Sequence, residues 1–296
     1  MDTATFIERY YTDRKGTNSL KWDLVDQRFE GENLLPLWVA DMDFKVADAI
    51  TEAFKERLDH GVYGYSLVPD SYFVAYSSWM KKRFNFEIDQ EWLRFTPGIV
   101  QALYYFMHVY TKPNDAVVIL TPVYYPFHNA VRDTGRQLIT VDLVNEENVF
   151  SIDFDVFEQA IIANDARVFI HCSPHNPTGR VWSEDEQMRL FEICEKHDVL
   201  IISDEIHQDF TYDDSRHIPS ARAAGGKYSD RIITANSASK SFNLAALGHS
   251  NILIPNADLR QAYDSFAATM IQTEANLFGV IATEAVYTDG AEWLES

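Results

Sequence analysis

The chain has 296 residues, 46% of them hydrophobic, and a formal net charge of −20 at pH 7. This length suits one large α/β domain, or one domain with part of another, and the apolar content excludes general disorder. The acidic surplus disfavours contacts with nucleic-acid phosphates and anionic lipid, so we expect neither nucleic acid nor a membrane as a partner. A small anion in a local basic or dipolar pocket is compatible with this charge.

The cysteines and the first residues bear on the cellular compartment. Cys172 and Cys194 both lie in apolar stretches, which indicates buried, reduced thiols rather than a disulfide framework. Met1 to Ala4 do not open a basic region followed by an apolar segment, and no apolar run approaches the ~20 residues that span a bilayer. We therefore expect a cytoplasmic protein, and we expect no bound metal.

The chain is predicted to begin with an arm and to continue with helices. Residues 1–45 show weak periodicity and are expected to form an extended arm. Apolar residues then recur every four positions from Val46 to Leu58, which predicts a helix with Gly61 as its C-terminal stop. In chain order, helices are expected over residues 46–60, 70–84, 99–110 and, after a capping box that starts at Ser183, up to about 197.

Short apolar runs between these helices predict buried strands. They cover residues 116–120, 168–172, 199–202 and 231–234. Strands that alternate with helices favour an α/β fold with a mostly parallel sheet covered by helices on both faces. In such sheets ligands bind beyond the carboxyl ends of the strands, so the residues that follow each run are the candidates for chemistry.

Three of these strand ends carry polar side chains. Asn176 follows the second run, Asp204 and His207 follow the third, and a hydroxyl-rich segment ending at Lys240 follows the fourth. Each feature alone has an ordinary structural explanation, because Asn-Pro-Thr-Gly is a good turn and single acids and lysines usually face solvent. Their combination on consecutive strands is what indicates a site.

The same segments carry a family resemblance along the whole chain. The motifs are Lys21-Trp22-Asp23, Trp38 to Phe44, Gly61 to Ser66, Pro122 to Phe127, Cys172 to Gly179, Ser203 to His207 and Ser239 to Asn243. With them the chain resembles fold-type I pyridoxal-phosphate enzymes of the class I and II aminotransferase superfamily. Within it, the chain is most similar to the cystathionine β-lyase branch, which includes the cystalysin-like carbon–sulfur lyases. The resemblance implies an aspartate-aminotransferase-like large domain with a seven-stranded type of sheet between helices.

The resemblance implies pyridoxal 5′-phosphate as cofactor and gives the strand-end residues their roles. Lys240 would form the covalent linkage to the cofactor, and Asp204 would keep the pyridine nitrogen protonated. Asn176 would donate to the phenolic oxygen of the ring. His207 stands where many aminotransferases have a tyrosine and is expected near that oxygen, although a core or surface histidine is the alternative.

The phosphate would bind at the start of the helix over 99–110. The backbone N–H groups of Gly98, Ile99 and Val100 are expected to hold it, since helix N-termini favour anions. The hydroxyls of Ser237 and Ser239 would add donors. Transaminases of the superfamily usually have an arginine eight residues after the lysine, where this chain has Gly248.

Three tyrosines complete the expected site. Tyr124 matches the aromatic residue that stacks on the pyridine ring, with core packing as the alternative. Tyr65 resembles the tyrosine that reaches the phosphate of a neighbouring subunit, which implies a homodimer with shared sites. Tyr125 could protonate the leaving sulfur, whereas Ala40 and Asp41 are expected to line the substrate pocket without a chemical role.

The implied reaction is an α,β-elimination on a small sulfur-containing amino acid such as cystathionine. It releases a thiol, pyruvate and ammonia, with Lys240 as the base that takes the α-proton. The nearest alternative is an aminotransferase that uses the same Lys240 and Asp204. A lyase that also acts as a regulatory protein is another alternative.

The domain boundaries are also an expectation from the resemblance. Residues 1–45 would form the arm and part of a small domain, 46–285 the large cofactor-binding domain, and 286–296 the start of a C-terminal small domain. The rest of that domain, with the arginine that grips the substrate α-carboxylate, would be missing from this chain. We would then expect weak binding of amino-acid substrates.

Overall fold

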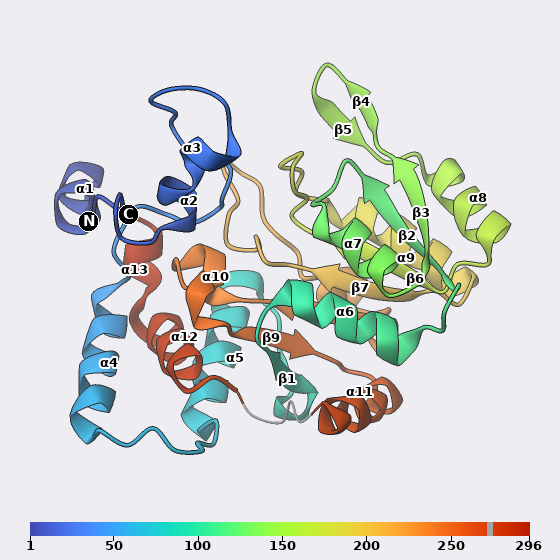
Figure 1. Cartoon of the computed structure of the whole chain (residues 1–296). Coiled ribbons are helices and arrows are strands. Elements are labelled where there is room, and N and C mark those ends of the chain that lie inside the picture. The colour runs from blue at the N-terminus through green and yellow to red at the C-terminus, as the bar shows by residue number, and fades with distance from the viewer. Residues whose placement is uncertain (271–274) are drawn as a thin grey trace.

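The structure, a computed structural model, describes residues 1–270 and 275–296, and its centre is a seven-stranded sheet (Figure 1). The strand order is β1-β9-β8-β7-β6-β2-β3, and only β9 runs antiparallel to its neighbours within this sheet. The strands are β1 (Leu93–Thr96), β2 (Ala116–Thr121), β3 (Gln137–Asp142), β6 (Val168–Cys172), β7 (Leu200–Asp204), β8 (Ile232–Asn236) and β9 (Ser250–Leu253), and a separate hairpin pairs β4 (Val144–Glu146) with β5 (Val149–Ser151). The expected α/β fold with a mostly parallel sheet is confirmed.

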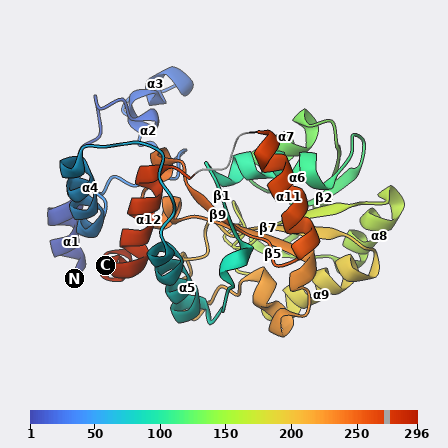
Figure 2. The same ribbon diagram turned by 90° about the horizontal axis from the view of Figure 1, so that it is seen from below.

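Helices cover the sheet on both sides (Figures 1 and 2). They are α1 (Thr3–Tyr10), α2 (Leu20–Asp23), α3 (Val25–Arg28), α4 (Asp48–His60), α5 (Asp70–Phe84), α6 (Ile99–Tyr110), α7 (Pro126–Asp133), α8 (Phe154–Asn164), α9 (Glu184–Lys196), α10 (Ala238–Ser241), α11 (Ala257–Thr269), α12 (Leu277–Asp289) and α13 (Ala291–Leu294). Successive residues of a strand point to opposite faces, so β2 sends Val117 and Ile119 to one core and Val118 and Leu120 to the other.

These two cores differ in which parts of the chain they contain. The core on the side of α6, α7 and α11, here called the α6-side core, draws its buried residues from Ile99 to Ala267. The core on the other side, here called the α5-side core, draws them from Phe6 to Trp293 and includes residues of α5, α8, α9 and α12. The sheet is thus buried on both faces, as the uninterrupted apolar strands predicted.

The predicted helix boundaries agree with the structure. α4 ends at His60, and Gly61 adopts φ +71°, a left-handed conformation that suits glycine at a helix C-terminus. Ser183 and Glu186 form the predicted capping box at the start of α9. The strands predicted over 199–202 and 231–234 are β7 and β8, and both continue two residues further, so that Asp204 is the last residue of its strand.

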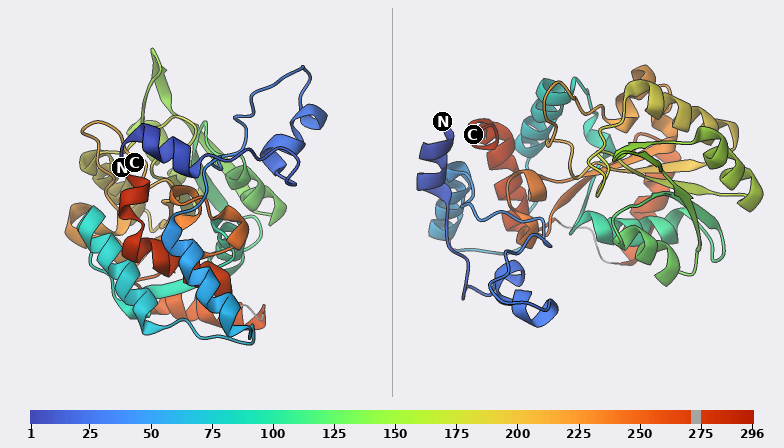
Figure 3. Two further views of the ribbon diagram at one scale, coloured as in Figure 1. Left: turned by 90° about the vertical axis from the view of Figure 1, so that its left-hand side faces the viewer. Right: turned by 90° about the horizontal axis from the view of Figure 1, so that it is seen from above.

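The expectation of an extended arm over residues 1–45 is wrong in part, because the segment contains α1, α2 and α3. Asp2 caps α1 by accepting the N–H of Thr5, and Phe6 and Tyr10 are buried on one face of that helix. The Phe6 ring lies 5.6 Å from the ring of Trp293, so α1 packs near the other end of the chain (Figure 3). This helix is stabilised by a contact across the whole chain, which local periodicity does not report.

The structure also bears on the remaining predictions for the termini, the thiols and the membrane. The last residues of the sequence form α12 and α13. Cys172 and Cys194 are free and buried, as predicted. Among the residues described here, none of the helices combines the length and the apolar character needed to cross a bilayer.

Candidate active site

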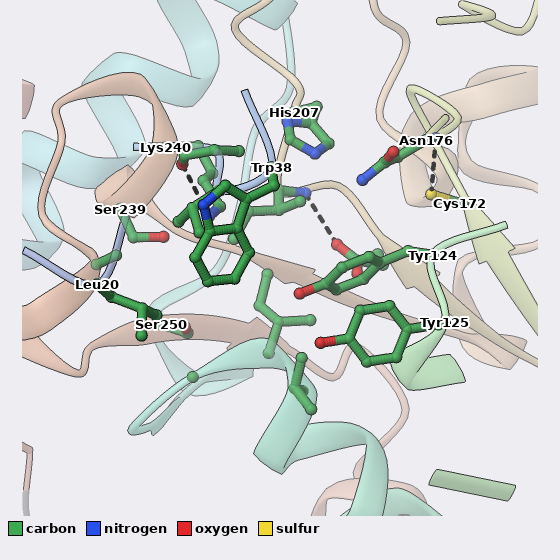
Figure 4. Close-up of a pocket in the computed structure, with 18 of the residues that line it drawn as sticks. Leu20, Trp38, Tyr124, Tyr125, Cys172, Asn176, His207, Ser239, Lys240 and Ser250 are labelled. Atoms are coloured by element: carbon green, nitrogen blue, oxygen red, sulfur yellow. Dashed lines mark hydrogen bonds between the residues drawn. The ribbon is translucent and has the colours of Figure 1, made fainter. Parts of the chain in front are cut away.

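A cavity of about 870 Å³ lies beyond the carboxyl ends of β6, β7 and β8 (Figure 4). One side, here called the sheet wall, is formed by residues at those strand ends: Cys172, Asn176, Asp204, His207, Ser239 and Lys240. The opposite side, here called the arm wall, comes from the N-terminal 45 residues: Leu20, Arg28, Phe29, Leu37, Trp38, Val39 and Ala40. The start of α6 and the tyrosines Tyr124 and Tyr125 also line the cavity. Ala40 lines this cavity, whereas Asp41 lies behind the wall in ion pairs.

Lys240 projects into this cavity from α10, four residues after the end of β8. Its Nζ donates a hydrogen bond to the carbonyl oxygen of Ala40 at 3.0 Å, so the two walls meet at the amine. Burial lowers the pKa of Lys240, while the nearby carboxylates of Asp41 and Asp204 act in the opposite direction. An amine with a lowered pKa is more often in the neutral, nucleophilic form.

Asp204 lies at the base of the same cavity, with only 5% of its surface exposed. Its Oδ1 accepts the backbone N–H of Ile206 at 3.0 Å, which fixes the carboxyl group at the strand end. Burial raises the pKa of Asp204 to about 7, and neighbouring Glu205 adds to the rise. A buried carboxyl in this state favours a cationic partner, because a positive charge restores the ionised form.

Asn176 and Tyr124 are joined by their backbones. The carbonyl oxygen of Asn176 accepts the N–H of Tyr124 at 3.0 Å. The N–H of Asn176 donates to Sγ of Cys172. Tyr124 is 38% exposed, and its ring lies 5.3 Å from that of Tyr125. Tyr124 is therefore not a core residue, which was the alternative interpretation. Figure 4 shows both tyrosines on one side of the cavity and Asn176 on its wall.

His207 also lines the cavity, at the end of the segment that follows β7. Burial lowers the pKa of His207 to about 4, and the charge on Lys240 adds to this effect. The imidazole is therefore neutral near pH 7 and can donate one hydrogen bond and accept another.

The start of α6 provides backbone donors to the cavity. Gly98 is the N-cap residue, no side chain caps the helix, and Gly98, Ile99 and Val100 all line the cavity. Ser239 lines it as well. Ser237 is not brought to the lining, because its hydroxyl donates to the carbonyl of His249 at 2.7 Å and accepts the N–H of Ser239.

Two of the predicted tyrosines are strongly exposed within this chain. Tyr125 lines the cavity and is 65% exposed. Tyr65 is 96% exposed and lines a separate hollow with Tyr63 and Leu277, so it does not reach the cavity of its own chain. An exposed aromatic ring is available for contact with a second molecule. The resemblance implies such a contact for Tyr65, with a neighbouring subunit.

Sequence reasoning missed Arg28, Trp38 and His249 as lining residues. Trp38 projects into the cavity beside Lys240 (Figure 4), and the guanidinium of Arg28 lies 4.7 Å from its ring centroid. Trp38 is the first residue of the motif Trp38 to Phe44, and this motif was the signal in the sequence that could have identified it. Arg28 and His249 had none, because their positions depend on how distant segments fold together.

The residues at this cavity fit pyridoxal phosphate. The buried Asp204 carboxyl, whose pKa is raised, suits a protonated pyridine nitrogen, and the uncapped start of α6 suits the phosphate. Lys240 supplies an amine on the same wall. In the described part of the chain, no group of three or more His, Cys, Asp or Glu side chains is arranged to hold a metal ion.

Known proteins resemble this chain in sequence and in fold. The family model for aminotransferase class I and II matches residues 32–292. The chain is 38% identical to cystathionine β-lyase PatB of Bacillus subtilis, over 96% of this chain and 73% of that protein. It is 31% identical to a cystathionine β-lyase of Corynebacterium glutamicum, over 95% of this chain and 72% of that protein.

A solved structure is similar throughout. Cystalysin from Treponema denticola, which contains a pyridoxal 5′-phosphate cofactor, superposes with a TM-score of 0.91 at 36% identity. The match covers 96% of this chain and 72% of that one. By its sequence, its sheet and its strand-end cavity, the chain belongs to the class I and II aminotransferase family.

Proposed function

We propose that the protein is a pyridoxal-phosphate-dependent carbon–sulfur β-lyase that acts on cystathionine or a related sulfur amino acid. The observation that carries the proposal is that Lys240 and Asp204 line one cavity from adjacent strands of the sheet. The relatives named cystathionine β-lyase and the similarity to cystalysin support the choice of reaction within the family.

The cofactor would supply an electron sink for the α-carbon of the bound amino acid. Lys240 would bind it covalently and, once the substrate amine has replaced that linkage, would take the α-proton at Nζ. The lowered pKa of Lys240 supports this role, because the base must be neutral before it accepts a proton. Asp204 would hold the proton on the pyridine nitrogen with its buried carboxylate.

The remaining lining residues would orient the reacting groups. Tyr124 would stack on the ring, and Asn176 and His207 would contact its phenolic oxygen. The N–H groups from Gly98 to Val100, with Ser239, would hold the phosphate. Ser237 would act through the position of Ser239, whose N–H it accepts. Tyr125, exposed at the cavity, would protonate the sulfur as it leaves the β-carbon.

The proposal includes a homodimer in which Tyr65 reaches the phosphate in the partner's site, a role supported by its nearly complete exposure here. It also includes a unit formed by residues 1–45 and 286–296 beside the cofactor-binding domain of residues 46–285. The packing of Phe6 on Trp293 supports that division. The free, buried cysteines are compatible with the proposed cytoplasmic location.

A product assay tests the reaction. The purified protein with pyridoxal phosphate is incubated with L-cystathionine, L-cysteine or L-alanine, and pyruvate and thiol are measured without any keto acid. A β-lyase consumes one water per turnover and forms equal amounts of thiol, pyruvate and ammonia from cystathionine, and no thiol from alanine. Turnover that requires an added keto acid would instead identify an aminotransferase.

A further inference from the structure

The contact between Lys240 and the arm wall involves the backbone of the arm. The Nζ of Lys240 donates to the Ala40 carbonyl at 3.0 Å, although 200 residues separate them in the chain. A backbone carbonyl can hold an amine only if its own segment is fixed. The segment Ala40–Phe44 has no helix or strand of its own, and a backbone bridge between Tyr11 and Phe44 fixes only its far end. The position of the part next to Ala40 therefore depends on side chains from elsewhere.

One set of contacts comes from Asn243, three residues after Lys240. Its Oδ1 accepts the N–H of Met42 at 3.0 Å, and its Nδ2 donates to the carbonyls of Met42 at 3.1 Å and Phe44 at 3.0 Å. A single side chain thus satisfies three backbone groups of the arm. Since Asn243 and Lys240 belong to the same short stretch, the amine and the arm share one anchor.

The other contacts form an ion cluster behind the arm wall, made of Arg14, Lys21, Asp41 and Asp43. Arg14 pairs with Asp41 at 2.8 Å and with Asp43 at 3.3 Å. Lys21 is buried, pairs with Asp43 at 3.1 Å and donates to the backbone carbonyl of Asp41 at 2.9 Å. The indole N–H of Trp22 donates to Asp43 at 2.8 Å. The four side chains carry two positive and two negative charges, so the cluster is neutral.

The charges of this cluster bear on the lysine. The groups that act electrostatically on Lys240 are Asp41 from the arm and Asp204 from β7, and the lysine in turn acts on His207. Asp41 favours the ammonium form of Lys240, and Arg14 balances Asp41. Removing Arg14 therefore leaves Lys21 alone against two carboxylates, and the resulting net negative charge favours protonated Lys240.

We propose that Asn243 and the Arg14–Lys21–Asp41–Asp43 cluster are positioning residues that hold the Ala40 carbonyl as the resting place of the free Lys240 amine. This inference deepens the proposed function, because a lysine that leaves the cofactor during turnover needs a fixed place from which to take the α-proton and to return. The arm thereby sets both where the amine rests and how readily it releases a proton.

The first test measures the lysine without any turnover. Cofactor-free protein is labelled at trace level with acetic anhydride between pH 6 and pH 11, and acetylation of the Lys240 peptide is measured by mass spectrometry. We expect Arg14→Gln to move the labelling midpoint upward by about 0.5 to 1 pH unit. Arg94→Gln is the matched control, because Arg94 forms a similar pair with Asp264 away from the cavity. An unchanged midpoint in Arg14→Gln would overturn the charge part of the proposal.

The second test separates position from stability. Asn243→Ala should lower kcat about tenfold with little change in KM, since a displaced base slows the chemical step more than binding. Asn256→Ala is the control, because Asn256 also bonds only to backbone groups, as the cap of α11. If the two variants lose similar stability and Asn243→Ala keeps its kcat, Asn243 is a structural residue only. The labelling test does not depend on catalysis, so failure of the lyase assay and failure of this inference are distinguishable.

Discussion

The sheet wall and the arm wall of the cavity differ in what holds their residues in place. Asp204 ends a strand that is buried on both faces, and Lys240 follows the next strand along the sheet, so hydrophobic packing fixes them. Ala40 and its neighbours are held by hydrogen bonds to Asn243, by the ion cluster behind them and by the short backbone bridge from Tyr11 to Phe44. The first wall is rigid because of its fold, and the second because of a few polar contacts.

This difference predicts how each wall responds to substitution. A change in the sheet wall should remove a chemical group and leave the fold in place. A change in the arm wall should alter the position or the proton affinity of a group on the other wall, or weaken a contact with the part of the substrate away from the reacting atoms. The predictions below test this division, from the largest expected effect to the smallest.

Lys240→Ala should abolish the covalent linkage to the cofactor and lower turnover by about 10³-fold or more, since it removes both the linkage and the base. Reduction with borohydride followed by peptide mapping measures the linkage. Lys112→Ala, on the exposed loop before β2, should leave it intact. A reduced cofactor adduct on any other lysine would show that the sheet wall does not carry the reaction.

Asp204→Asn should still bind pyridoxal phosphate, with weaker affinity, and lose about 10²-fold in kcat. The amide keeps the size of the side chain and removes the charge that would keep the pyridine nitrogen protonated. Steady-state kinetics of pyruvate formation measure the loss. Near-normal elimination by this variant would contradict the role of Asp204.

The same substitution should stabilise the cofactor-free protein in a pH-dependent way. The pKa of Asp204 is about 7 in the fold and 3.8 as the ordinary value, so ionisation destabilises the native state as pH rises between these values. At pH 8 we expect Asp204→Asn to raise the free energy of unfolding by at least about 2 kcal/mol, with a smaller gain at pH 5. Urea unfolding at both pH values measures this gain, and a gain that shrinks with rising pH would refute it. Asp133→Asn, at the exposed end of α7, is the control.

Tyr124→Leu should raise the dissociation constant for pyridoxal phosphate about three- to tenfold, the worth of one aromatic contact. Tyr124→Phe keeps the ring and should bind the cofactor nearly as well as the parent protein. Equilibrium titration of the cofactor measures both. Equal weakening in the two variants would mean that the hydroxyl group, rather than the ring, makes the contact.

The smallest effect is expected at Arg28, on the arm wall. Its side chain is exposed at the cavity, where it would pair with the second carboxylate of cystathionine. An exposed ion pair of this kind contributes under about 1 kcal/mol. Arg28→Gln should therefore lower kcat/KM for cystathionine, which has a second carboxylate, by about two- to fivefold relative to S-ethyl-L-cysteine. An unchanged ratio of the two kcat/KM values would show that Arg28 does not contact the second carboxylate of cystathionine.

The sequence predicted one wall far better than the other. Strand ends can be read locally, so Asn176, Asp204 and Lys240 were placed from apolar runs and from the residues that follow them. The arm was expected to be extended, because α1 depends on the contact of Phe6 with Trp293 and no local period reveals such a contact. Arg28 and Asn243 were missed as contacts for the same reason. The side chain of Ser237 was expected at the phosphate, and only the structure shows its bond to the His249 carbonyl.

The unequal cores on the two faces of the sheet have a consequence for synthesis on the ribosome. Among the residues that the structure describes, the α6-side core includes none after Ala267, so it can close before the rest of the chain is made. The α5-side core includes Val280, Val286 and Trp293, which emerge after all of the α6-side core and must return to α5 and α1. Until then that face of the sheet has the cover of α5, α8 and α9 but lacks that of α12, so the nascent chain exposes apolar surface on a single side. A chaperone that binds this protein during translation should therefore bind that face.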